Sequence, residues 1–100
     1  MDEYTVEILD GAWAELEGIY GYIAGHFLEP GTADAMADAL EAGIYSLEHM
    51  PYRNPERQRG FFANKGYRQL IVKNYTIVYR VDEPTHTVFV VTVRYSRSDF

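Results

Sequence analysis

The spacing of apolar residues changes once along this chain, and that change limits the folds open to it. Between residues 12 and 47 apolar side chains recur mainly at steps of three and four, which is the period of amphipathic helices. From residue 67 to residue 95 they alternate or run continuously, which is typical of strands. A helical region followed by a run of strands predicts an α+β fold.

Turn and cap residues divide these regions into elements. Residues 4–9 predict a short strand, and residues 10–27 predict a helix capped by Asp10. Glu29-Pro30-Gly31 breaks the chain, and Thr32 then caps a second helix that ends near His49. Two helices with so short a connection predict an antiparallel helical hairpin.

Three strands are expected in the second half of the chain. They cover residues 67–72, 75–81 and 88–95, with turns at 73–74 and 82–86 between them. Residues 51–66 form a long polar connection before the first of these strands. The element order is β-α-α-β-β-β, and we expect one domain over residues 1–100 with the helical hairpin packed on one face of an antiparallel sheet.

Composition excludes several classes of protein. The chain has 100 residues and no cysteine, so disulfides, zinc–thiolate sites and cysteine nucleophiles are ruled out. The spacing of its histidines suggests no metal site, and we expect no metal and no cofactor. No apolar run approaches the ~20 residues of a membrane span. Because Met1-Asp2-Glu3 is also unlike a signal peptide, we expect a cytoplasmic protein without membrane contact.

Charge is divided unevenly along the chain. Residues 1–50 hold eleven acidic and no basic residues, whereas residues 51–100 hold four acidic and nine basic ones. The two halves therefore carry −11 and +5, which sum to the net charge of −6. Either the folded protein has an acidic face and a basic face, or the two halves neutralise each other across the fold.

Several short stretches, taken in their order and spacing, carry a family resemblance. They are Ile44–Leu47, Pro51–Pro55, Gly66–Val72, Asn74–Glu83 and Val93–Asp99. In these stretches the chain resembles the RelE/ParE superfamily of toxins from bacterial type II toxin–antitoxin modules, which includes plasmid stabilisation proteins. The resemblance implies a protein that arrests growth when free and that a cognate antitoxin neutralises.

The superfamily offers two mechanisms, and the resemblance implies different residues for each. A RelE-like endoribonuclease would cleave mRNA on the ribosome without a metal, with Arg68, Arg94 and Arg97 as phosphate clamps and Tyr95 between the last two. However, Thr76 stands where nuclease members place an arginine. This favours ParE-like inhibition of DNA gyrase, with a non-toxic remnant that only binds a partner as a third reading.

The remaining basic residues of the second half are candidates for binding a target or nucleic acid. They are Arg53, Arg57, Arg59, Lys65, Lys73 and Arg80. We expect the arginines of the three-strand region to converge on one surface. The resemblance implies an antitoxin that wraps the groove beside the helical hairpin and the sheet edge, in a toxin–antitoxin hetero-oligomer or beside a toxin homodimer.

Overall fold

The computed structural model describes residues 3–27, 30–98 and 100. Met1, Asp2 and Glu29, which enter the expectations about localisation and the helix break, lie outside these ranges. The elements, in chain order, are β1 (Thr5–Ile8), α1 (Asp10–Phe27), α2 (Pro30–Tyr45), the 3₁₀ turns η1 (Ser46–Glu48) and η2 (Pro51–Arg53), β2 (Arg68–Val72), β3 (Tyr75–Asp82) and β4 (Thr87–Tyr95).

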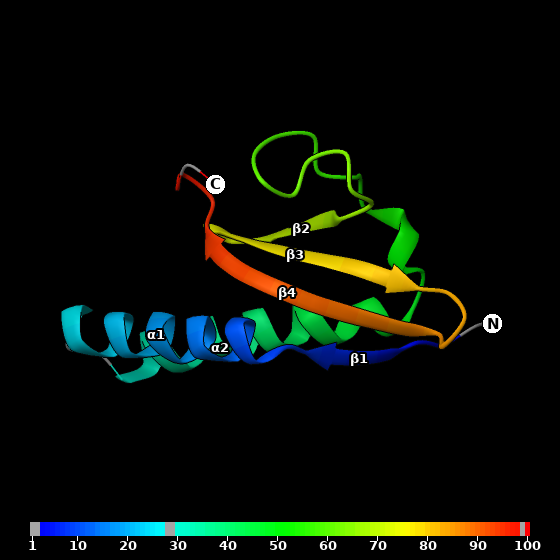
Figure 1. Ribbon diagram of the computed structural model, residues 1–100. Coiled ribbons are helices and arrows are strands. Elements are labelled where there is room, and N and C mark those ends of the chain that lie inside the picture. Colours follow the sequence, from blue (N-terminus) through cyan, green and yellow to red (C-terminus); the bar gives the residue numbers. More distant parts are fainter. Residues whose placement is uncertain (1–2, 28–29, 99) are drawn as a thin grey trace.

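One four-stranded sheet with strand order β1-β4-β3-β2 lies beside the helical hairpin (Figure 1). Helices α1 and α2 cover one face of the sheet, and the long connection between η2 and β2 lies on the other side. The predicted α+β fold and helical hairpin are therefore confirmed. None of the helices in the described ranges is both long and apolar enough to cross a bilayer.

The sheet is mixed rather than wholly antiparallel, because β1 pairs with β4 in parallel, from Thr5 opposite Thr87 to Ile8 opposite Val90. The hairpin explains this direction. Helix α1 leads the chain away from β1 and α2 brings it back, so β2 starts at the end of the sheet where β1 started. Two antiparallel hairpin connections later, β4 runs the same way as β2 and β1.

The bounds of the second helix differ from the prediction. Helix α2 begins at Pro30, so Thr32 lies inside the helix instead of capping it. Proline fits the first turn of a helix, where its missing N–H would have no partner in any case. The helix ends at Tyr45 and tightens into η1, and Pro51 begins η2.

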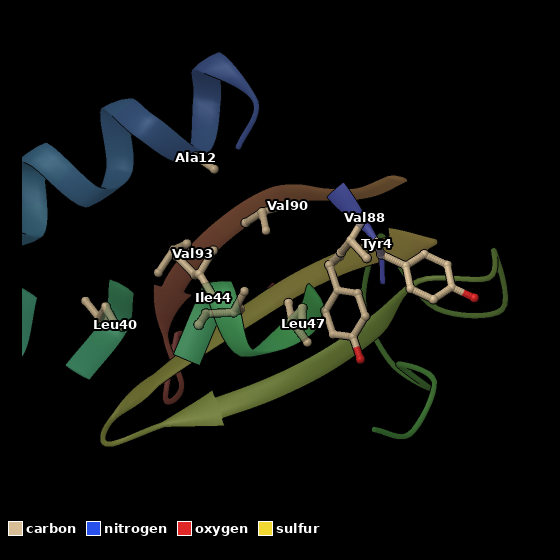
Figure 2. Packing of buried hydrophobic residues seen from close by; sticks show 10 residues of the cluster. Tyr4, Ala12, Leu40, Ile44, Leu47, Val88, Val90 and Val93 are labelled. Carbon is tan, nitrogen blue, oxygen red and sulfur yellow. The ribbon is translucent and has the colours of Figure 1, made fainter. Parts of the chain in front are cut away.

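The core lies between the hairpin and the sheet. Ile44 and Leu47 from the end of the helical region meet Val88, Val90 and Val93 of β4 (Figure 2). The remaining buried members of this cluster are Tyr4, Ala12, Leu40, Ile77 and Tyr79. These residues carry the helical and the alternating periods seen in the sequence, so each period marks the face that the element buries.

Gly43 is a point of close approach between α2 and the sheet. A Cβ atom built on Gly43 would lie 2.6 Å from Cγ2 of Val72 on β2, whereas one on Gly21 of α1 meets nothing within 4 Å.

We predict that Gly43→Ala destabilises the protein by about 1–3 kcal/mol through this overlap. Gly21→Ala, the matched control, should stabilise it by about 0.5–1 kcal/mol by reducing backbone entropy. Urea unfolding of both variants tests this, and a stabilising Gly43→Ala would contradict the close approach.

A carboxylate ties the N-terminal segment to the β3–β4 turn. Tyr52 and Tyr4 donate their hydroxyl hydrogens to Glu83 Oε2 and Oε1, at 2.5 Å and 2.8 Å. The Tyr4 ring also stacks on His86 at 4.6 Å. These hydrogen bonds, with that of Tyr52 the larger influence, hold the pKa of Glu83 below its ordinary value.

Because the folded protein lowers the pKa of Glu83, ionised Glu83 favours folding above its unfolded pKa, and this contribution is lost as the pH falls through the folded pKa. We predict that Glu83→Gln lowers Tm at neutral pH. The difference in Tm from the parent protein should shrink between about pH 6 and about pH 3. Thermal unfolding followed by circular dichroism across this range is the measurement. A Tm difference that stays constant with pH would count against stabilisation by ionised Glu83.

Candidate functional site

The helical hairpin extends past the end of the sheet (Figure 1). A groove lies between the hairpin and this end of the sheet. The groove has a volume of about 1010 Å³. Its hairpin side is apolar and includes Ile19, Ile23 and Met36, and its sheet side includes Tyr75 and Tyr95. We call this the overhang groove. Ile23 is buried, and Ile19 and Met36 pack against the core cluster, so the hairpin side of the groove is an apolar wall that continues the core.

Three tyrosine side chains line the mouth of the overhang groove. The rings of Tyr75 and Tyr95, which face each other across β3 and β4, meet edge to face at 5.9 Å. Tyr22 from α1 also lines the groove and is 58% exposed. Burial raises the pKa of Tyr75, with the nearby phenols of Tyr22 and Tyr95 adding to the effect. The Tyr75 phenol is therefore neutral at physiological pH, beside the apolar wall of the groove.

Glu15 of α1 occupies the part of the β4 edge that β1 does not reach. Its carboxylate accepts hydrogen bonds from the Thr92 hydroxyl at 2.7 Å and from the Val93 backbone N–H at 3.2 Å. It also pairs with Nε of Arg94 at 3.3 Å. This network satisfies an edge donor that would otherwise be open to another strand, and it neutralises Arg94.

A second cluster lies on the opposite face of the sheet, under the long connection. Arg57 is only 4% exposed and donates to Gln69 Oε1 and to the Phe100 carbonyl, both at 2.8 Å. Its Nε has no partner in the described residues. The Phe100 ring lies 4.1 Å from the Arg57 guanidinium and 5.1 Å from that of Arg94. Burial, with the charges of Arg59 and Arg94, lowers the pKa of Arg57.

Arg68 is separated from this cluster by the sheet. In the strand register, Arg68 lies opposite Tyr79, a core residue on the face that the hairpin covers. Arg94 lies opposite Thr76, on the other face of the sheet. Arg68 donates to the carbonyls of Tyr52 and Asn54, at 3.2 Å and 2.6 Å. Since alternate residues of a strand point to opposite faces, Arg68 and Arg94 lie on opposite faces. The expected convergence of the arginines is wrong for this pair.

A β-bulge in β4 causes the separation. Up to Tyr79 opposite Val90 the β3–β4 register is regular, but Val78 lies opposite Thr92, so Val91 is an extra residue. Without the bulge Arg94 would lie opposite Tyr75, on the same face as Arg68. A one-residue shift of register moves every following side chain to the other face.

The remaining sequence candidates divide between structural contacts and exposed positions. Arg53 donates to the carbonyls of His49 and Met50, at 2.5 Å and 3.2 Å, and so fastens η1 to η2. Lys65 lies 3.9 Å from the centre of the Phe61 ring, and Arg80 lies 4.5 Å from that of Phe89. The other three, which are exposed in the long connection, in the β2–β3 turn and after β4, are Arg59, Lys73 and Arg97.

Ion pairing between the acidic half and the basic half of the chain is sparse in the described residues. Among the ion pairs of the described ranges, only Glu15–Arg94 joins the acidic half of the chain to the basic half. The two alternatives for how the fold distributes this charge stay predictions.

Sequence reasoning missed the polar side chains that organise both clusters. Glu15 lies one position off the apolar stripe of α1, and its only signal was a carboxylate next to that stripe. Gln69 and Phe100 gave no signal, because their contact with Arg57 depends on how the long connection folds back.

Comparisons with known proteins agree with this fold. The family model described as the ParE toxin of the type II toxin–antitoxin system parDE matches residues 6–100. A search of curated proteins finds no significant match. Among solved structures, the chromosomal ParDE toxin–antitoxin system from P. aeruginosa contains a chain with a TM-score of 0.77 and 14% identity, covering 95% of this chain and 98% of that one.

Two RelE-type structures are also similar. The RelBE toxin–antitoxin complex from Mycobacterium tuberculosis gives a TM-score of 0.65 at 21% identity, covering 93% of this chain and 98% of that one. A mutant of the E. coli toxin RelE in the free state gives 0.65 at 15% identity, covering 95% and 85%. At these identities the structures establish the fold, and the family assignment rests on the model match along nearly the whole chain. The chain belongs to the ParE toxin family of type II toxin–antitoxin systems.

Proposed function

We propose that this toxin arrests growth by binding a protein target, DNA gyrase, and that it does not cleave RNA. The separation of Arg68 from Arg94 by the sheet supports this proposal most strongly. Metal-free RNA cleavage needs cationic donors and an acid–base group around one phosphate. Here Arg94 is paired with Glu15, and Tyr95 packs against Tyr75.

We propose further that the cognate antitoxin neutralises the toxin by filling the overhang groove. A volume of about 1010 Å³ with apolar walls suits an amphipathic helix that lays one face into it. Two solved relatives with this fold are toxin–antitoxin complexes by name, which supports an antitoxin partner here. The free toxin would then expose the groove, and the bound form would be a hetero-oligomer.

The test uses the purified chain in two assays. It should inhibit supercoiling of plasmid DNA by gyrase and leave mRNA intact on translating ribosomes. Addition of the antitoxin encoded beside it should restore supercoiling. Normal supercoiling at high toxin concentration would count against the gyrase target.

One observation favours the RelE-like alternative. Arg57 and Arg94 lie on one face, 4.1 Å and 5.1 Å from the same Phe100 ring, and Arg59 is near enough to Arg57 to lower its pKa. A phosphate could be clamped there if Phe100 moved away. Cleavage of mRNA that falls in an Arg94→Ala variant and persists in an Arg68→Ala variant would select this alternative over gyrase binding.

A further inference from the structure

The solvent-exposed side of the helical hairpin combines aromatic rings with carboxylates. Its residues recur at steps of three and four, so each helix contributes one stripe. Tyr20 of α1 donates to Asp34 of α2 at 3.0 Å, which joins the two stripes. We call this surface the hairpin face, and its members, all exposed, are Trp13, Glu17, Tyr20, Asp34, Asp38, Glu41 and Tyr45.

A cavity opens on the hairpin face where α1 begins and α2 ends. Its volume is about 210 Å³, and Leu16, Leu40 and Ile44 contribute to its lining. Trp13 and Tyr45 also line it and are 48% and 40% exposed. The cavity can take one apolar side chain between the two aromatic rings, which is how an anchor residue of a docked helix is held.

The charge around the cavity decides which partner fits. Glu41 lines it, and Asp38 lies one helical turn earlier on α2. Residues 1–50 contain no lysine or arginine, so the hairpin supplies no cation of its own to these carboxylates. Aromatic faces also attract cations. An acidic segment is repelled here, whereas a segment with lysines or arginines around an apolar anchor is attracted.

We propose that the hairpin face docks a cationic amphipathic helix of a partner protein. An apolar side chain of that helix enters the cavity between Trp13 and Tyr45, and its basic residues pair with Asp38 and Glu41. A second copy of the toxin is a poorer occupant, because its Arg57 bonds Gln69 on the face of the sheet opposite to the hairpin. Such contacts would be head to tail and would build open chains.

This site is separate from the overhang groove, and the proposal does not depend on the gyrase target or on the antitoxin. Trp13 is the only tryptophan of the chain, so its fluorescence reports on the cavity directly. The probe is a synthetic helical peptide with leucines on one face and arginines flanking them. Added to the full chain, it should shift Trp13 emission saturably, whereas a peptide with glutamates in place of the arginines should not.

Matched variants locate the binding. Asp38→Asn with Glu41→Gln should weaken binding of the arginine peptide about fivefold, since two surface ion pairs are removed. Glu3→Gln with Glu7→Gln, which removes two exposed carboxylates at β1, should change it less than about twofold. Equal effects of the two pairs, equal binding of both peptides, or no binding would overturn the proposal. So would an emission shift that follows toxin concentration without peptide, which would identify a second copy as the occupant.

Discussion

Leu47→Ala is expected to destabilise the protein by about 2–5 kcal/mol. Leu47 is fully buried in η1, where it packs beneath β4 with Ile44 and Val88 (Figure 2). The loss combines the transfer free energy of the removed carbon atoms with the cost of a cavity that the rigid sheet cannot close. Urea unfolding measured by circular dichroism gives the free energy of unfolding.

Ile71→Ala is the matched control for this substitution. It removes the same number of carbon atoms from β2, but Ile71 is 58% exposed. Its cost should stay below about 1 kcal/mol. If the two variants lost equal stability, η1 would not be part of the core that joins the hairpin to the sheet.

Loss of antitoxin binding is the second large effect that we expect. The double variant Tyr22→Asp, Tyr95→Asp places two carboxylates at the mouth of the overhang groove, beside its apolar walls. Aromatic anchors of an interface are worth about 2–4 kcal/mol, so the Kd for the cognate antitoxin should rise about 30- to 1,000-fold. Isothermal titration calorimetry measures this change.

Tyr45→Asp serves as the control for the groove variant. Tyr45 is 40% exposed, against 43% for Tyr95, but it lies on the hairpin face outside the overhang groove. The Kd for the antitoxin should change less than about threefold in this variant. An unchanged Kd in the Tyr22→Asp, Tyr95→Asp variant would place the antitoxin elsewhere, provided that the variant unfolds at the temperature of the parent.

The element order could be predicted because each element buries one face. Ile44 and Leu47 fall on the helical period, and Ile77 and Tyr79 fall on the strand period, and all four are core residues. The direction of β1 could not be read this way, because a four-residue strand carries the same alternation in either direction. Its parallel pairing with β4 follows from the path of the hairpin, which is a property of the whole fold.

The candidate site was harder to predict, and the bulge at Val91 is the main reason. The two-residue turn at Lys73-Asn74 fixes Arg68 opposite Tyr79, which is the register that a tight hairpin requires. A similar count from the β3–β4 turn would place Arg94 on the same face as Arg68. The sequence around Val91 is a continuous apolar run, so nothing in it marks the extra residue that sends Arg94 to the other face.

The central claim is tested most directly by the growth of a bacterial host that expresses this chain alone, with soluble toxin verified in the same cells. The account predicts arrest soon after induction, relaxed plasmid DNA and intact mRNA, with growth restored when the antitoxin is co-expressed. Undiminished growth in the presence of soluble, folded protein would contradict it, and arrest accompanied by cleaved mRNA with normal supercoiling would contradict the protein target.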